Sequence, residues 1–271
     1  MSSGSPLSGN RVDILGVSVS TGTIRDAVAT VEHWIGQRTR RYICITGAHG
    51  IMESRSDPQF RNILNSADMV TPDGQPLVWF SRLLRNTPTE RLYGPDLMRA
   101  VTAVSGPRGY RHFYYGGAPG VAEQLQQAML RQHPTLEVVG THCPPFRELT
   151  PEEDDAVVAR INAARPDIVW VGLSTPKQEL WMARHRERIE APVMVGVGAA
   201  FDFLAGTKRQ APKWMQKTGL EWLFRLLSEP RRLGRRYAYI VPGFALLALN
   251  ELIARAVPPG LSHIGRRSPG T

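Results

Sequence analysis

The sequence is poor in cysteine and lacks an apolar segment near its start. Cys44 and Cys143 are the only two cysteines among 271 residues, and neither has a partner at the short spacing of a zinc or redox pair. Residues 1–9 are a polar Ser/Gly/Pro-rich leader without the hydrophobic core of a signal peptide. These absences favour a reduced, cytoplasmic protein that buries an apolar core without crosslinks. We expect disorder in residues 1–10 and 258–271.

Three short motifs of nucleotide chemistry are absent as well. The chain has no Asp-x-Asp pair to hold a divalent metal on a diphosphate, no Walker loop and no Gly-x-Gly-x-x-Gly after its first expected strand. We therefore expect no metal and no other cofactor. Arginine side chains would then have to balance the negative charge of a leaving diphosphate.

Positive charge is concentrated near the C-terminus. The chain carries 33 Lys and Arg against 24 Asp and Glu, a net charge of +9, and nine basic against two acidic residues lie between Lys208 and Tyr239. Nucleic acid, anionic lipid and phosphorylated small molecules all attract such charge. Aromatic residues and leucines interleave with the arginines over residues 219–256, which favours a membrane surface and argues against nucleic acid. A second basic pair, Arg266-Arg267, lies close to the end of the chain.

The apolar run from Tyr237 to Leu249 is short and contains Pro242 and Gly243, so we expect it not to span a membrane. We predict instead that residues 208–257 form a basic amphipathic appendage that lies at the bilayer interface. A pair of C-terminal helices packed on the core is the alternative.

Strand-like apolar runs alternate with segments of helical period along residues 11–207. This alternation predicts a Rossmann-like α/β fold whose mostly parallel sheet is covered by helices on both faces. A break near residues 105–112 would divide this catalytic domain into two subdomains. Thr21 or Thr23, and Thr150 with Glu153, are the expected helix caps. The expected strands lie at 11–19, 42–45, 67–70, 111–115, 136–141, 167–173 and 191–197, and the expected helices at 21–36, 51–64, 120–132, 152–164, 177–188 and 219–227.

Asp73 lies in a tight turn, Thr71-Pro72-Asp73-Gly74, directly after an expected strand. Ligands of open parallel sheets bind at the carboxyl ends of the strands. A carboxylate there suits a general base, because the acceptor hydroxyl in an inverting sugar transfer loses its proton as it attacks. An ordinary Asp-Gly turn gives the same pattern, and spacing alone does not separate the two.

Two further groups lie between an expected strand and an expected helix. Gly116 and Gly117 begin a glycine-rich loop whose free N–H groups could hold a phosphate, although a plain turn has the same composition. Lys177 and Gln178 open a helix and could hold a pyrophosphate, unless they are solvated beside a simple helix cap.

Gly198 and Asp202 follow the last expected strand. Asp202 could reach a ribose or sugar hydroxyl, and the alternative is a packing turn. His49, shortly after Thr46, could help to bind substrate, although a lone histidine is more often structural. His142 and Cys143 have no other metal ligands near them in the sequence.

Many short runs, in this order, resemble the WecG/TagA/CpsF glycosyltransferases, which form glycosyltransferase family 26. The resemblance covers about residues 11–249. The matching runs are Thr46-Gly47-Ala48-His49-Gly50, Asp57-Pro58, Leu64-Asn65-Ser66-Ala67-Asp68, Thr71-Pro72-Asp73-Gly74-Gln75-Pro76-Leu77-Val78-Trp79, Tyr93-Gly94-Pro95-Asp96-Leu97, Pro176-Lys177-Gln178-Glu179, Gly196-Val197-Gly198-Ala199-Ala200-Phe201-Asp202, Arg209-Gln210-Ala211-Pro212, and Gly219-Leu220-Glu221-Trp222 through Glu229-Pro230-Arg231-Arg232.

The resemblance implies an inverting, metal-independent transfer of a hexose-type sugar from a UDP-sugar to an undecaprenyl-diphosphate-linked sugar. Such reactions build bacterial surface polysaccharides or wall polymers. The family also implies a peripheral protein on the cytoplasmic face of the inner membrane.

The resemblance assigns roles to matching residues. Asp73 becomes the catalytic base, Thr46 helps to position acceptor or donor, and Gln178 is a polar contact near the reacting groups. Asp202 becomes a donor-binding residue. Either Arg225 or Arg232, in the C-terminal appendage, contacts the donor diphosphate. Many family members have Asn near the position of Gly47, so the contact made by that amide is absent here.

Two other functions remain open from the residues alone. A nucleotide-binding oxidoreductase is disfavoured because the glycine fingerprint is missing. A non-catalytic membrane or nucleic-acid binding module would use only the basic tail. The sequence does not define the acceptor sugar, the linkage or the transferred sugar, which could be glucose, ManNAc or a uronic acid. An apolar appendage that must be hidden away from the membrane is consistent with a homo-oligomer.

Overall fold

The computed structural model describes residues 7, 10–85 and 89–256. The expected disordered tail at 258–271, almost all of the expected leader, and the pair Arg266-Arg267 lie outside the described residues.

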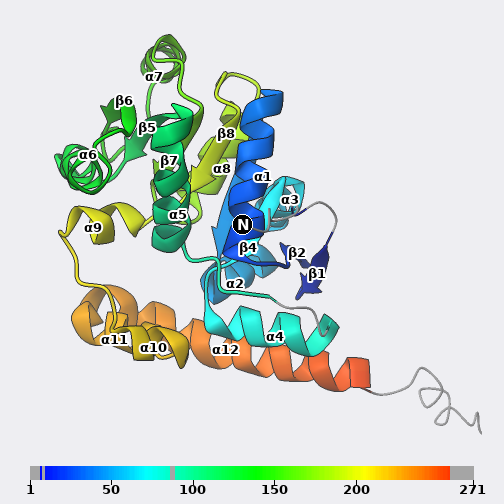
Figure 1. Cartoon of the computed structure of the whole chain (residues 1–271). Helices are drawn as coiled ribbons and strands as arrows, with labels where there is room; N and C mark the ends of the chain where they lie inside the picture. Colours follow the sequence, from blue (N-terminus) through cyan, green and yellow to red (C-terminus); the bar gives the residue numbers. More distant parts are fainter. Residues whose placement is uncertain (1–6, 8–9, 86–88, 257–271) are drawn as a thin grey trace, which may run out of the picture.

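The centre of the protein is a six-stranded parallel sheet (Figure 1). Its strands are β3 (Arg41–Thr46), β4 (Met69–Pro72), β5 (Arg111–Gly116), β6 (Glu137–His142), β7 (Ile168–Gly172) and β8 (Val193–Gly196), in the spatial order β4-β3-β8-β7-β5-β6. The predicted Rossmann-like α/β fold is therefore confirmed. Strands from both sides of the suggested break at 105–112 belong to this one sheet, and the division into subdomains stays a prediction.

Helices cover both faces of the sheet because successive strand residues point to opposite sides. Tyr114 belongs to one buried cluster, whereas Phe113 and Tyr115 belong to the other. Helices α1 (Ile24–Gln37), α5 (Gly94–Arg108), α6 (Val121–Gln132) and α9 (Ala200–Ala205) contribute to the first cluster. Helices α2 (Ala48–Ser56), α3 (Pro58–Ser66), α4 (Gln75–Arg85), α7 (Pro151–Ala163) and α8 (Lys177–His185) contribute to the second.

Two sequence predictions near the N-terminus were wrong. The expected first strand is a separate hairpin, β1 (Arg11–Ile14) and β2 (Val17–Ser20), because Leu15 and Gly16 take left-handed backbone conformations that turn the chain. The expected helix 51–64 is two helices, α2 and α3. Asp57 breaks it by accepting a hydrogen bond from the N–H of Phe60, which caps α3, and the next residue is Pro58.

The predicted caps are formed. Thr23, rather than Thr21, caps α1. Thr150 and Glu153 make the reciprocal hydrogen bonds of a capping box at the start of α7. Helices α4 and α5 were not predicted.

The C-terminal part of the described chain is helical. Helices α10 (Lys213–Lys217), α11 (Glu221–Ser228) and α12 (Pro230–Ala256) lie together at one end of the molecule in Figure 1. Helix α12 is continuous through Pro242 and Gly243, so the expected interruption was wrong, and by length and composition it could cross a membrane. One of its faces packs on the second buried cluster through Ile240 and Phe244.

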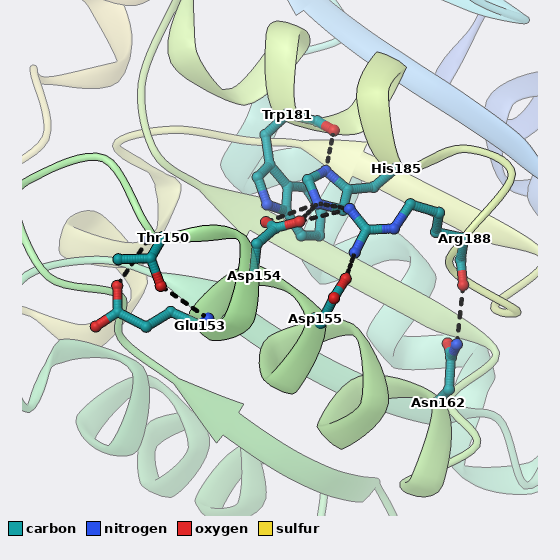
Figure 2. Close-up of polar contacts among 8 residues, drawn as sticks. All are labelled: Thr150, Glu153, Asp154, Asp155, Asn162, Trp181, His185 and Arg188. Atoms are coloured by element: carbon teal, nitrogen blue, oxygen red, sulfur yellow. Dashed lines mark hydrogen bonds and ion pairs between the residues drawn. The ribbon is translucent and has the colours of Figure 1, made fainter.

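A polar network joins α7 to α8 (Figure 2). His185, almost fully buried at the end of α8, places Nδ1 2.7 Å from the carbonyl oxygen of Trp181 and Nε2 2.9 Å from Oδ1 of Asp154. Arg188 binds both Asp154 and Asp155. Burial alone would raise the pKa of Asp154, but the hydrogen bonds from Arg188 and His185 outweigh it and lower that pKa. The network fixes α8, whose other end carries Gln178.

Replacing Asp154 by asparagine should lower the free energy of unfolding by about 2 kcal/mol at neutral pH, because two charge-assisted hydrogen bonds are lost. A carboxylate with a lowered folded-state pKa stabilises the fold fully above its ordinary pKa of about 4, and this contribution disappears as the pH falls from there through the lower folded-state pKa. Urea unfolding at several pH values measures the difference. Asp155→Asn is the matched control, since this exposed carboxylate binds the same Arg188. Equal destabilisation by both variants would contradict the role given to Asp154.

Candidate functional site

The predicted site residues gather because the sheet is parallel. Thr46 of β3 lies in register with Pro72 of β4, so Asp73 follows directly beside the exit of β3. Gly116 of β5 pairs with Gly172 of β7, and β8 ends at Gly196 between β3 and β7. The loops after all five strands therefore meet at one edge of the sheet, where ligands of such sheets bind.

Asp73 is held by its backbone. Its N–H donates to the carbonyl oxygen of Thr46 at 2.9 Å, and its own carbonyl oxygen accepts a hydrogen bond from Nε of Arg91. A Cβ atom placed on Gly47 would lie only 3.7 Å from Oδ2 of Asp73, so the glycine keeps this flank of the carboxyl group open.

The carboxyl group of Asp73 is in a mixed electrostatic environment. Its pKa is raised to about 6: burial is the largest cause, Arg91 and Arg225 oppose the increase, and the negative charge of Glu221 adds to it. A carboxyl group with this pKa is deprotonated at neutral pH and is a stronger base than an exposed aspartate.

The contact between Arg91 and Glu221 was missed by sequence reasoning. Both side chains are nearly buried, at 11% and 14% exposed, and Nη2 of Arg91 forms an ion pair with Oε2 of Glu221. The hydroxyl of Tyr93 donates to Oε1 of Glu221 at 3.1 Å, and the guanidinium of Arg91 lies 3.9 Å from the centre of the Tyr93 ring. This cluster joins helix α11 to the Asp73 turn. Arg91 and Glu221 are 130 positions apart in the sequence, so no local pattern indicates that they pair.

Thr46, Gln178 and Glu179 form a buried polar group at the same edge. All three side chains are almost completely buried. Oε1 of Glu179 accepts hydrogen bonds from Nε2 of Gln178 at 3.0 Å and from the hydroxyl of Thr175 at 2.9 Å. Within the part of the chain that the structure describes, Oγ1 of Thr46, Oε1 of Gln178 and Oε2 of Glu179 have no hydrogen-bond partner. Burial raises the pKa of Glu179.

The C-terminal arginines approach this edge near His49. The pKa of His49 is lowered to about 4, mainly by burial and in addition by the positive charges of Arg236 and Arg225. His49 is therefore neutral at pH 7, and its Nε2 lies 3.8 Å from Oε2 of Glu53 on the same helix. The charges of Arg225 on α11 and Arg236 on α12 thus act near the end of β3, while the role predicted for Arg225 stays a prediction.

The predicted donor-binding residues divide into two groups. Nζ of Lys208 lies 3.3 Å from Oδ2 of Asp202 and 4.0 Å from Oε1 of Glu229, and Glu229 also forms an ion pair with Arg232. Asp202 and Arg232 are thus linked through Lys208 and Glu229. Hydroxyl Oγ1 of Thr207 donates to Oδ1 of Asp202 as well.

The glycines and Lys177 make up the second group. A Cβ atom on Gly116 would lie 2.7 Å from the backbone of Gly172, so this glycine permits close contact between β5 and β7. The N–H of Gly117 donates to the carbonyl oxygen of Gly172 at 2.9 Å. Gly198 has a left-handed conformation beside Gln178, and Lys177 is exposed. Their donor-binding roles stay predictions.

Among the described residues, no group of three or more His, Cys, Asp and Glu side chains is placed to hold a metal ion. Positive charge is present at this edge: Arg91 and Arg225 act on Asp73, and Arg225 and Arg236 act on His49.

Comparison with known proteins identifies the class of enzyme. Residues 12–257 match the model of the Glycosyl transferase WecG/TagA/CpsF family. Two relatives, from Staphylococcus aureus strains MW2 and NCTC 8325, are each described as N-acetylglucosaminyldiphosphoundecaprenol N-acetyl-beta-D-mannosaminyltransferase. Each is 30% identical over 227 residues, which are 83% of this chain and 87% of the relative.

The protein is therefore a glycosyltransferase. It belongs to the WecG/TagA/CpsF family, and the resemblance seen in the sequence is confirmed. The oxidoreductase and the non-catalytic binding module are both set aside by this membership.

Substituting Glu221 by glutamine should loosen α11 and α12 from the Asp73 turn, because Arg91 would keep a buried charge without its counter-ion. We expect a loss of about 3 kcal/mol in the stability of this docking. Limited trypsin digestion checks it, since cleavage after Arg225, Arg231 and Arg235 should become faster. Glu251→Gln, which removes an exposed ion pair with Arg255 on α12, is the control. Wild-type digestion rates in Glu221→Gln would contradict the anchoring role.

Proposed function

We propose that the protein transfers a hexose-type sugar from a UDP-sugar to a sugar carried on undecaprenyl diphosphate, with inversion and without a metal ion. The names of the relatives specify an undecaprenyl-diphosphate-linked acceptor for those proteins, which supports the same class of acceptor here. The position of Asp73 carries the proposal: a carboxyl group with a raised pKa, beside buried polar atoms, at the ligand-binding edge of the sheet.

In the proposed reaction Asp73 is the general base. The acceptor hydroxyl oxygen attacks the anomeric carbon of the donor, and its proton passes to the carboxylate of Asp73. The bond between the anomeric carbon and the diphosphate oxygen breaks in the same displacement, so UDP leaves and the configuration inverts. Thr46 and Gln178, from the neighbouring strand exits, contact the reacting sugars.

Arginines balance the charge of the departing UDP. Arg225 on α11 already lowers the pKa of both His49 and Asp73, so its positive charge acts at this edge. Arg232 lies with Asp202 and is the second candidate for the diphosphate. Glu221 anchors α11, the helix that carries Arg225, to Arg91 beside Asp73. One ion pair therefore links the arginine that would balance the leaving-group charge to the turn that holds the base.

The acceptor lipid requires the protein to work at a membrane. Four large side chains of α12, at 239, 246, 249 and 253, are more than half exposed and recur at helical spacing along one face. Arg231 and Arg235, eight and four residues before Tyr239, extend this face. The buried side chains Leu233, Tyr237, Ile240 and Phe244 lie on the opposite face. We therefore favour a helix that lies on the cytoplasmic surface of the membrane over one that crosses it.

The reaction is tested by UDP release from the full-length protein with a panel of UDP-sugars and an undecaprenyl-diphosphate-linked sugar, in the presence of EDTA. Asp73→Asn should reduce turnover by at least about a thousand-fold while donor binding is retained, because the amide cannot take the proton. Asp155→Asn, which changes an exposed carboxylate on α7 that is not among the charges acting on Asp73, is the control. Undiminished turnover in Asp73→Asn would remove it as the base, and dependence on added metal would refute the metal-free mechanism.

Membrane binding is tested by sedimentation with vesicles that contain anionic lipid. Replacing Leu246 and Leu249 together by glutamate should reduce the bound fraction at least several-fold, since two charges would enter the apolar boundary. Phe146→Glu, on an 88% exposed side chain outside the C-terminal helices, should leave binding unchanged. Equal binding by both variants would show that this face of α12 does not contact lipid.

A further inference from the structure

Glu179 is a fully buried carboxyl group for which the proposed reaction has no use. Among the described residues it has no ion pair, and its hydrogen bonds come from neutral groups: the carboxamide of Gln178, the hydroxyl of Thr175 and a backbone N–H. A buried carboxyl without a cationic partner is costly and calls for a reason. One of its contacts is with Gln178, a residue that the proposed reaction does use.

Glu179 determines which way the Gln178 carboxamide points. The two ends of a carboxamide have nearly the same shape, and its orientation follows from its hydrogen bonds. With Nε2 donating to Glu179, Oε1 is directed away from that carboxyl. Against the ionised carboxylate, the reversed carboxamide would place two acceptor oxygens against each other, so Glu179 in this form selects one orientation.

In this orientation Oε1 of Gln178 reaches the edge of the sheet. A Cβ atom on Gly198 would lie 3.4 Å from Oε1, and one on Gly196 would lie 3.1 Å from the carboxamide carbon. The two glycines at the exit of β8 therefore leave the space that the carboxamide occupies. Oε1 is buried and has no hydrogen-bond partner in residues 10–85 and 89–256.

A second buried polar atom lies at the adjacent strand exit. Cys44 of β3 pairs with Gly196 at the end of β8, so Thr46 at the end of β3 and Gly198 in the loop after β8 both lie at this edge. Oγ1 of Thr46 has no hydrogen-bond partner among the described residues either, and Asp73 follows on the other side of β3. The acceptor oxygen of Gln178 thus faces the same edge as Asp73, where a bound sugar can satisfy it.

We infer that Glu179 is a positioning residue: it holds Gln178 so that Oε1 accepts a hydrogen bond from an O–H or amide N–H of a sugar substrate. This inference rests on the proposed function. The inference also predicts that the site prefers sugars with a hydrogen-bond donor opposite Oε1 of Gln178. A sugar analogue without that O–H or N–H group would leave Oε1 buried and unpaired.

The test compares Glu179→Gln, Gln178→Met and the double variant. The Glu179→Gln variant keeps the shape of the side chain but can present either an oxygen or a nitrogen to Gln178. The orientation of the Gln178 carboxamide is then no longer selected. We expect the KM for one substrate, donor or acceptor, to rise about ten-fold, the loss of one hydrogen bond, while kcat and the other KM stay within about two-fold. In the Gln178→Met background, Glu179→Gln should have no further effect on that KM.

Several measurements keep the outcome clear. Glu179→Met, which removes the acceptor from 179 altogether, should give the same KM shift, and thermal unfolding checks that each variant is folded. Glu187→Gln, an exposed glutamate just beyond α8, is the control. Calorimetric binding of UDP-sugars and of a soluble acceptor analogue repeats the comparison without turnover.

The failures are distinguishable. If the wild-type protein transfers no sugar to the lipid-linked acceptor, the proposed function fails, and calorimetry still decides the role of Glu179. If both KM values and both binding constants are unchanged in Glu179→Gln, or if the two single effects multiply in the double variant, Glu179 is not a positioning residue.

Discussion

The buried ion pair between Arg91 and Glu221 connects the two halves of the candidate site. Arg91 holds the backbone of Asp73 from one side and the first turn of α11 from the other. Its charge opposes the burial that raises the pKa of Asp73, while Glu221 partly cancels that opposition. The same contact therefore sets the basicity of the carboxyl group and the position of the helix that carries Arg225.

The parallel sheet brings the remaining groups to this contact. Strands β4, β3 and β8 are neighbours, so Asp73, Thr46 and Gly198 lie at consecutive exits along one edge. Glycines at 47, 196 and 198 leave the space beside Asp73 and Gln178 open. The polar network of His185, Asp154 and Arg188 fixes the C-terminal end of α8 (Figure 2). Gln178 and Glu179 lie in the first turn of the same helix. Contacts at one end of α8 thus help to determine where the buried side chains of Gln178 and Glu179 lie at the other end.

The sequence predicted those features that depend on local or periodic patterns. The alternation of strand and helix gave the α/β fold, the capping box at Thr150 was formed, and the strand exits placed Asp73 beside Thr46. Contacts between distant residues could not be predicted, and Arg91 with Glu221 is the main example. The hairpin at Leu15 was missed because its turn depends on left-handed conformations in an otherwise alternating run. Helix α12 continues through Pro242, where packing on the protein core outweighs the usual cost of proline in a helix.

The central claim is that Asp73 is a base tuned by burial and by the arginines around it. The pH dependence of kcat/KM tests this most directly, since it reports the ionisation of the essential base in the free enzyme. Because only the deprotonated carboxylate accepts the proton, activity should be lost as the pH falls through about 6 and should level off above it. The account predicts this acidic limb in the wild-type protein. A profile that stays flat from about pH 5 to 8, or a limb near the ordinary aspartate pKa of about 4, would contradict it.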